Sequence, residues 1–575
     1  MTTLTTLTVA AGARAASPPA LEASTGMVVT AQHFASEAGA AVLRQGGNAV
    51  DAAVAVGYAL AVTHPCCGNL GGGGFMMIHL ADGRNTFINF REKAPLAARA
   101  DMFLDPHGDP MSDKSVNGYL AVGVPGTVLG LETARQEYGT LARPVLMAAA
   151  IRLADDGFVV TRGDVDELEV GSPDFHAQPN VAAVFLHDGA AYKPGERLVQ
   201  RNLAATLRAI SDGGAAAFYH GPIAGAVVAA SRANGGLLTE QDFAAYGVTE
   251  SAPLSCRYRG YTILSAPPPS SGGVALCEML QVLERYPLHA LGFHSSESVH
   301  LMTEAMRSAY RDRNTLLGDP AFVDNPVERL LSARHTDEIR ARIRPQRATP
   351  SSALGSAAAD REHATTTHYS VVDSAGNAVA VTYTINDDFG AKVIAGESGF
   401  FLNDEMDDFT AKPGAGNLFG LVQGKANAIA PGKRPLSSMT PTIVLKDGKP
   451  VLVVGSPGGA RIITTVLEVI VNVIDHGMTL QEAVDAPRIH HQWLPDTLAG
   501  EPFALSADTV KALKRMGYRV VPLKPWGTGN AAEVIGIAPA DAAQAEELGF
   551  PRPGIFYGAS DSRAPAGSAA APELR

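Results

Sequence analysis

The chain has 575 residues, of which 46% are hydrophobic and 18% are charged, a composition typical of a globular protein. Its formal net charge of -12 argues against a nucleic-acid partner, because binding to phosphates requires a basic surface. No stretch approaches the ~18 consecutive apolar residues of a membrane span, so no membrane span is expected.

Residues 1–26 are predicted to be a tail or a signal segment. They contain a mildly apolar stretch followed by Ala-Arg-Ala-Ala, which resembles the cleavage site of an exported protein, but they lack a basic start. We expect a periplasmic or secreted protein, with a cytoplasmic protein as the alternative.

The first predicted elements are two helices separated by Gly46-Gly47, because glycine ends the first helix and Asn48 can cap the second. A hairpin that turns at Asp82-Gly83 follows. Helical and turn-rich segments then alternate to about residue 343, and a turn cluster at 266–273 enters a helix.

No metal and no cofactor are expected. The glycine-rich sequence at 68–75 lacks the Gly-Lys-Ser/Thr of a phosphate loop and is interpreted as close backbone packing. Side chains of the neighbours His490 and His491 point apart and make poor joint ligands. No cysteine spacing resembles a zinc site, and adjacent cysteines rarely bond to each other, so buried or idle thiols are expected. The four cysteines are Cys66, Cys67, Cys256 and Cys277.

Residues 346–365 are small and polar with little apolar periodicity, which predicts a mobile loop and the clearest break in the chain. Strands follow this loop, interrupted by a glycine-rich loop at 412–424. A helix is predicted from about Ala460 to Asp475, and the last residues, 564–575, are predicted to be disordered.

Three threonines open the hairpin that follows the break. "HYSVVD" and "AVAVTYTIN" alternate as strands do, and "DSAGN" between them supplies turn residues. A turn centred near Ala375 places Thr366 opposite Thr384, with Cβ atoms ~5 Å apart, although a register shifted by one residue remains an alternative. Asn386 then points to the same face. Thr365, Thr367 and Thr382 are interpreted as ordinary strand threonines.

A threonine hydroxyl needs a base to act as a nucleophile. If the chain were cut before Thr366, the new α-amine would have a pKa of ~7.7–8.0 and could take the hydroxyl proton. One residue would then be both nucleophile and base, a known variant of this pairing. The mobile loop before Thr366 makes such a cut compatible with an intact sheet.

Longer motifs resemble a known family. "TTHYSVVDSAGNAVAVTYTIN", "GESGFFLNDEMDDF", "KRPLSSMTPTIV", "GSPGGARIITTV" and "DAPRIHHQWLPD" resemble the small subunit of the γ-glutamyltransferases, the glutathione hydrolase proenzymes. "GGNAVDAAVAV", "GNLGGGGF", "FREKAP", "GVPGTVLGL", "FYHGPIA", "GGLLTEQDF" and "PPPSSGG" resemble the large subunit. The resemblance spans about residues 27–563 in the expected order.

The resemblance implies an α+β fold, the four-layer αββα sandwich of the N-terminal-nucleophile hydrolases. It implies self-cleavage of the Thr365–Thr366 bond. Residues 27–365 would form the large subunit and residues 366–575 the small catalytic subunit, and the two would stay together as a heterodimer.

The resemblance also assigns roles to single residues. Thr366 would be the nucleophile, Thr384 would orient it, and the N–H groups of Gly458 and Gly459 would hold the oxyanion. The residues that would bind the α-carboxylate of a γ-glutamyl donor are Arg91, Ser437 and Ser438. The residues that would bind its α-ammonium are Asn386, Glu405 and Asp408. Residues 412–431 resemble a lid over this site, with Phe419 as an aromatic gate.

The activity implied is cleavage of glutathione and related γ-glutamyl compounds through an ester on Thr366, with transfer to water or to amino acids and dipeptides. One alternative is a cephalosporin acylase of the same family, which removes a glutaryl group. Because glutaryl lacks the α-ammonium, the presence of Glu405 and Asp408 favours the glutamyl substrate. Another alternative is a processed but inactive binding protein.

Overall fold

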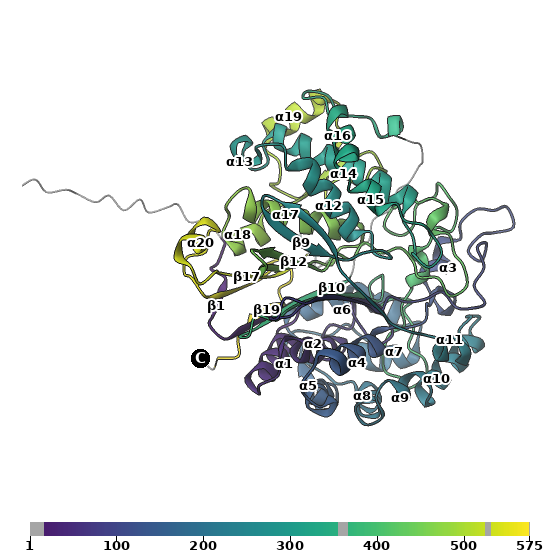
Figure 1. The fold of residues 1–575 in the computed structure, drawn as a ribbon. Helices are drawn as coiled ribbons and strands as arrows, with labels where there is room; N and C mark the ends of the chain where they lie inside the picture. Colours follow the sequence, from purple (N-terminus) through teal and green to yellow (C-terminus); the bar gives the residue numbers. More distant parts are fainter. Residues whose placement is uncertain (1–16, 355–365, 524–530, 574–575) are drawn as a thin grey trace, which may run out of the picture.

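The computed structural model describes residues 17–354, 366–523 and 531–573. Two antiparallel seven-stranded sheets lie face to face at its centre, and helices cover the outer face of each sheet (Figure 1). This arrangement is the four-layer αββα sandwich expected from the sequence. No helix of the described ranges is long and apolar enough to span a membrane.

Hydrogen bonding between neighbouring strands defines the order within each sheet. The first sheet consists of β1 (Leu21–Ala23), β18 (Phe556–Ser560), β17 (Glu533–Ile537), β13 (Lys449–Val454), β12 (Thr442–Lys446), β9 (Tyr261–Ser265) and β8 (Leu254–Tyr258). The second consists of β19 (Ser568–Ala570), β2 (Gly26–Thr30), β10 (Thr367–Asp373), β11 (Ala378–Thr384), β3 (Gly73–His79), β4 (Asn85–Asn89) and β7 (Thr249–Ser251). Two small sheets are β14 (Ile489–His490), β15 (Leu498–Gly500) and β16 (Val520–Pro522), and β5 (Phe158–Val159) with β6 (Arg197–Leu198).

One helical layer packs on the second sheet: α1 (His33–Arg44), α2 (Ala49–Thr63), α4 (Thr127–Tyr138), α5 (Arg143–Asp155), α6 (Arg162–Phe175), α7 (Pro179–Phe185), α8 (Arg201–Gly213), α9 (Ala215–Tyr219), α10 (Pro222–Ala233) and α11 (Glu240–Ala244). The other packs on the first sheet: α12 (Gly272–Leu283), α13 (Leu288–Leu291), α14 (Ser296–Leu316), α16 (Ala333–Arg342), α17 (Ile462–Ile474), α18 (Leu480–Asp485), α19 (Ala507–Met516) and α20 (Ala542–Glu547). The short helix α15 (Val327–Leu330) belongs to the same layer, near α12 and α16, whereas α3 (Ser112–Val116) lies at the side (Figure 1).

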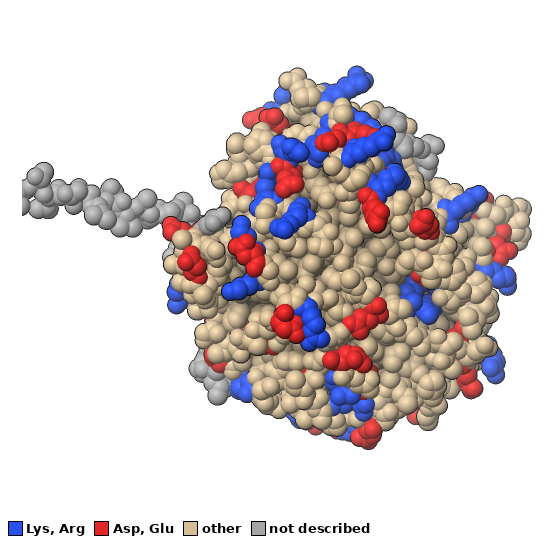
Figure 2. Space-filling model, viewed as in Figure 1, with Lys and Arg blue, Asp and Glu red and all other residues tan. Residues whose placement is uncertain are grey.

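Basic and acidic side chains are mixed over the face of the molecule that Figure 2 shows. Lysine and arginine side chains lie beside aspartate and glutamate side chains across this face rather than gathering into one basic stripe. A nucleic acid is bound by a continuous basic surface, so this face does not favour such a partner.

A separate apolar cluster fills the space between the sheets. Met27 and Phe75 from one sheet pack there with Ile443 and Val453 from the other, and all four are buried. Alternation along each strand sends one set of side chains to this layer and the next set to the helices, as the period of two requires. The threonine hairpin therefore lies at the centre of the molecule.

The predicted register of this hairpin is confirmed. Thr367 pairs with Tyr383 and His368 with Thr382, so the residue numbers of each pair sum to the expected value. β10 also pairs with β2 on its other side, and β11 pairs with β3. The catalytic candidate Thr366 therefore directly precedes a strand in the middle of a sheet.

The helix break and the first hairpin are also confirmed. Gly46 adopts a left-handed φ of 88°, and Asn48 caps α2 by accepting a hydrogen bond from the Asp51 N–H at 2.9 Å. β3 and β4 are joined at Asp82-Gly83. The glycine-rich sequence packs closely, as expected: a Cβ on Gly72 would lie 1.9 Å from the Thr384 carbonyl oxygen.

Three expectations were wrong. The tail predicted at 1–26 includes β1 and the start of β2, and the disorder predicted at 564–575 is contradicted by β19, which pairs with β2. The cysteines expected to be idle form two disulfides, Cys66–Cys67 and Cys256–Cys277. Part of the predicted mobile loop, residues 355–365, lies outside the described residues, while Ser351–Leu354 forms a 3-10 turn.

Candidate active site

A narrow cavity of about 20 Å³ lies where β10 begins and β11 ends. It gathers most of the residues assigned from the sequence. The lining residues are Arg91, Thr366, Thr384, Asn386, Glu405, Asp408, Phe419, Ser437, Ser438, Met439, Gly459 and Ile462. Gly458 directly precedes one of them, and Thr365 lies outside the described residues.

The two threonines meet as the hairpin register predicts. Thr366 Oγ1 lies 3.2 Å from Thr384 Oγ1, and both residues are buried. The N–H of Asn386 donates to Thr384 Oγ1 at 2.9 Å. Because that bond occupies one lone pair of Thr384, its hydroxyl hydrogen remains available to orient Thr366 Oγ1.

Gly458 and Gly459 form a tight turn before α17. Both have positive φ, 133° and 52°, which side chains rarely allow. A Cβ on Gly459 would lie 2.6 Å from the Phe419 ring. Among the described residues neither N–H donates a hydrogen bond, so both remain able to bind a developing oxyanion.

Arg91 follows β4 and is buried, with its guanidinium directed at two carboxylates of the turn Glu405–Asp408. One nitrogen donates to Glu405 and another to Asp408, and Nε donates to the Pro435 carbonyl at 3.3 Å. Burial lowers the pKa of Arg91, but Glu405 and Asp408 raise it more strongly, so it stays charged. The fixed cation and the anionic pair expected from the sequence are thus in direct contact.

Burial also raises the pKa of Glu405 well above its usual range, against the lowering effect of Arg91. Its second carboxylate oxygen, Oε2, has no hydrogen-bond partner among the described residues. A buried carboxylate that lacks donors is costly unless another cation or donor approaches it. A cation that approached Oε2 would favour the charged form of Glu405.

One residue of the segment expected to form a lid, 412–431, lines this cavity: Phe419. The Leu418 N–H donates to the Asp407 carboxylate at 2.8 Å, and Gln492 Nε2 donates to the Phe419 carbonyl at 3.0 Å. Phe419 itself lies against Gly459 and is buried. These bonds hold an aromatic ring over the oxyanion candidates.

Arg313 of α14 contacts the candidate site although no sequence motif indicates it. Its guanidinium donates to Ser438 Oγ at 2.8 Å and to Gln423 Oε1 at 3.2 Å, and so joins the candidate serine to the lid. Burial lowers the pKa of Arg313 to about 10. In the sequence it stands in "YRDRN", where alternating charges resemble an exposed helix face, so no local signal marks it.

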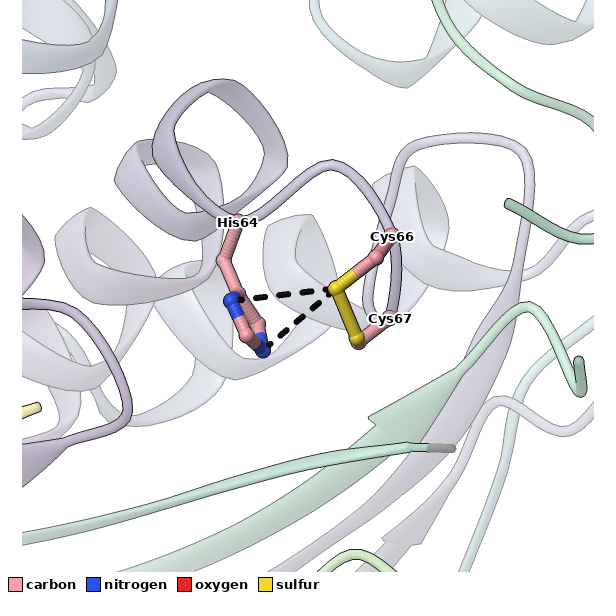
Figure 3. A group of neighbouring side chains, drawn as sticks. All are labelled: His64, Cys66 and Cys67. Atoms are coloured by element: carbon pink, nitrogen blue, oxygen red, sulfur yellow. Dashed lines mark hydrogen bonds between the residues drawn. A yellow bond between two sulfur atoms is a disulfide. The ribbon is translucent and has the colours of Figure 1, made fainter. Parts of the chain in front are cut away.

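The Cys66–Cys67 disulfide lies beside the end of β11. Cys67 O accepts a hydrogen bond from the Ile385 N–H at 3.2 Å, and Cys66 O accepts one from the Phe389 N–H at 2.8 Å. Both ring nitrogens of His64 lie 3.8 Å from Cys66 Sγ (Figure 3). These contacts bracket Asn386, one of the cavity residues.

Two groups in the described ranges have the composition of a metal site. His64, Cys66 and Cys67 form one, but both sulfurs are joined to each other. Glu278, Asp312 and His335 form the other, and His335 Nε2 lies 2.8 Å from Asp312 Oδ2, as in a buried ion pair. Neither group lines the cavity at Thr366. His490 and His491 have different partners, Thr464 and Asp496.

Known proteins share this sequence and this fold. The family model described as gamma-glutamyltranspeptidase matches residues 35–571. The glutathione hydrolase proenzyme of Pseudomonas sp. (strain A14) is 55% identical over 96% of this chain and 94% of its own. That of Escherichia coli (strain K12) is 48% identical over 94% and 91%. The solved structure of cephalosporin acylase from Bacillus halodurans superimposes with a TM-score of 0.83, at 25% identity, over 100% of both chains.

Proposed function

The chain belongs to the gamma-glutamyltranspeptidase family of self-processing acyl-transfer enzymes, and we propose that Thr366 is both its processing site and its nucleophile. Cleavage before Thr366 would separate residues 27–365 from a catalytic part, 366–575. The single observation that supports this role best is the 3.2 Å contact between the Thr366 and Thr384 hydroxyls inside the charged cavity.

In the proposed reaction, the free α-amine of Thr366 takes the proton of its hydroxyl, and Oγ1 attacks the γ-amide carbonyl of the donor. The N–H groups of Gly458 and Gly459 hold the oxyanion of the tetrahedral intermediate. The resulting ammonium protonates the leaving amine, the C–N bond breaks, and a γ-glutamyl ester remains on Thr366. Water or an acceptor amine then attacks the ester and releases glutamate or a new γ-glutamyl amide.

The donor is recognised through its two charges on one carbon. Arg91, Ser437 and Ser438 would bind the α-carboxylate, because a guanidinium fork matches carboxylate geometry. Asn386, Glu405 and Asp408 would bind the α-ammonium. Support comes from their shared cavity and from Glu405 Oε2, which has no hydrogen-bond partner within the part of the chain that the structure describes. Glutathione is the proposed donor, and amino acids or dipeptides are the proposed acceptors.

A cephalosporin acylase remains the second candidate, since a solved structure of that name has the same fold. Its glutaryl group carries no ammonium and would bring no cation to Glu405 and Asp408 beyond Arg91, which already contacts both. Two buried carboxylates in the cavity therefore favour the γ-glutamyl donor.

We also propose export to the periplasm or beyond the cell. Two disulfides among the described residues support an oxidising compartment, because cytoplasmic thiols are kept reduced.

Release of p-nitroaniline from γ-glutamyl-p-nitroanilide, with glutaryl-p-nitroanilide as the control, tests the proposal. Activity on the first compound and little on the second is expected. Preference for the glutaryl compound would establish the acylase, and no activity on either would support the inactive binding protein.

A further inference from the structure

The Cys66–Cys67 disulfide is joined to the cavity through the backbone. The backbone carbonyl groups of the two cysteines accept hydrogen bonds from the N–H groups of Ile385 and Phe389, and Asn386 lies between these two residues. The Ile385 carbonyl in turn accepts the Asp404 N–H at 3.1 Å, and Asp404 precedes Glu405. Both cysteines are buried, so this covalent link lies inside the protein.

The bracketed stretch has an unusual backbone. Asn386 has a φ of 80° and Phe389 a φ of 61°, both in the left-handed region. Non-glycine residues in such conformations cost ~1–3 kcal/mol and persist only when surrounding contacts hold them. The contacts that hold this stretch include the two carbonyl groups of the disulfide.

Two successive contacts link Asn386 to the proposed nucleophile, Thr366. Its N–H bonds Thr384 Oγ1 at 2.9 Å, and Thr384 Oγ1 lies 3.2 Å from Thr366 Oγ1. Its side-chain Nδ2 donates to the Asp404 carbonyl at 3.2 Å. A change in the backbone at Cys66-Cys67 would therefore move a donor-binding residue before it moved the rest of the fold.

We propose that Cys66 and Cys67 are positioning residues whose closed disulfide holds Asn386 and Thr384 in place, so that reduction by a low-molecular-weight thiol weakens donor binding. The inference rests on the proposed function of the same cavity. A bond between neighbouring side chains restrains the backbone of both residues. Opening it removes this restraint from the two carbonyl groups that accept hydrogen bonds from Ile385 and Phe389.

Reduction needs two equivalents of thiol. A thiolate attacks one sulfur, the Cys66–Cys67 bond breaks, and a mixed disulfide forms as the other cysteine leaves as a thiolate. A second thiol displaces the first, leaving two protein thiols and one oxidised disulfide of the reductant. Glutathione, the proposed donor, belongs to this class of thiol.

Cys66 Sγ has a carboxylate and an imidazole beside it: Glu167 Oε2 lies 3.5 Å away, and the other neighbour is His64. Its ring nitrogens lie 3.8 Å from Cys66 Sγ, and its Nδ1 lies 2.9 Å from Glu167 Oε2 (Figure 3). Burial lowers the pKa of His64, but the Glu167 carboxylate raises it, and the net direction is upward. A positively charged imidazole beside a sulfur stabilises its thiolate, and the Glu167 carboxylate acts against this effect.

The second disulfide provides a matched control. Cys256 and Cys277 join β8 to α12 and do not line the cavity. The variant Cys256→Ser/Cys277→Ser therefore keeps only the Cys66–Cys67 bond, and Cys66→Ser/Cys67→Ser keeps only the other. Each would be purified after processing and equilibrated with graded dithiothreitol. Thiols would be counted by alkylation and mass spectrometry, and activity assayed with γ-glutamyl-p-nitroanilide, which contains no thiol.

We expect the KM of Cys256→Ser/Cys277→Ser to rise at least threefold at the potential where its thiols appear, and to return on reoxidation. Cys66→Ser/Cys67→Ser should have a raised KM that dithiothreitol does not change further. An unchanged KM in the reduced first variant would overturn the inference. If that disulfide resists reduction, a wild-type KM in processed Cys66→Ser/Cys67→Ser overturns it equally. Absence of turnover by the oxidised wild type would instead refute the proposed function.

Discussion

Thr366 and Thr384 face each other across the β10–β11 hairpin with their hydroxyl oxygens 3.2 Å apart. The pair is fixed by the register of a buried hairpin that is hydrogen-bonded to β2 on one side and β3 on the other. A change at either threonine can therefore be tested without disturbing the sheet, because both side chains are small and point into the cavity.

Replacing Thr366 with alanine should abolish processing and activity together. The purified variant should run as one chain of 59.8 kDa, whereas the wild type should give two fragments that sum to this mass. Mass spectrometry of the fragments reads the new terminus directly. Thr366→Ser is the matched control, because it keeps a hydroxyl and should process more slowly but still process. A wild-type chain that stays whole while releasing p-nitroaniline would contradict the scheme.

Replacing Arg91 with lysine should raise the KM for γ-glutamyl donors by about tenfold, which corresponds to ~1.4 kcal/mol. Lysine keeps the charge but cannot contact two acidic groups and a carboxylate with one planar fork. Processing should continue, since Arg91 does not touch Thr366 through any hydrogen bond found in the described ranges. Steady-state kinetics on processed protein measures the effect, and an unchanged KM would remove Arg91 from the donor site.

Replacing Gly459 with alanine should lower kcat by roughly 10²-fold, the usual effect of losing an oxyanion donor. The added methyl group would meet the Phe419 ring at 2.6 Å in a backbone conformation that favours glycine. Gly448→Ala is the control, because Gly448 has a similar φ of 78° but open space around it. Equal losses in the two variants would point to general destabilisation rather than to the oxyanion.

The ratio of transfer to hydrolysis should rise between pH 7 and pH 9 in excess glycylglycine. The acceptor must attack as a neutral amine, and an α-amino group has a pKa of ~7.7–8.0. Water needs no such deprotonation before it binds. Product analysis by chromatography at several pH values measures the ratio, and a flat profile would argue against attack by a free amine on an acyl-enzyme.

Acid should destabilise the fold through His368. Burial lowers the pKa of His368 to about 3, so the folded state leaves it neutral while the unfolded state binds a proton below pH 6.5. The free energy of unfolding should therefore fall as pH drops from 6.5 towards 3, by ~2–3 kcal/mol between pH 6.5 and 4.5. Urea unfolding at both pH values should show a smaller fall in His368→Gln. A similar fall in both proteins would exclude His368 as a source.

Local signals in the sequence predicted the hairpin, whereas the family resemblance assigned most of the residues that line the cavity. The turn residues "DSAGN" indicate the hairpin register, and the register places Thr384 beside Thr366. Arg313 could not be predicted, since its partners Ser438 and Gln423 are more than a hundred residues away in the chain.

The disulfides and β19 could not be predicted from the sequence. Whether two cysteines bond depends on where the fold places them, and neither the sequence separation nor the residue types reveals it for Cys256 and Cys277. β19 consists of Ser-Ala-Ala, which has no intrinsic preference for a strand, and it forms because β2 offers a free edge. Tertiary contacts decide such elements, so they become visible only in the folded structure.

Each central sheet contains strands that precede the Thr365–Thr366 bond and strands that follow it. β2, β3, β4 and β7 precede it and share one sheet with β10, β11 and β19, which follow it. β1, β8 and β9 share the other sheet with later strands. Scission before Thr366 would leave two polypeptides that cannot part without dismantling both sheets. Neither polypeptide alone contains a complete hydrophobic core. If the two polypeptides were expressed in separate cells, they should therefore fail to reconstitute the folded protein when mixed.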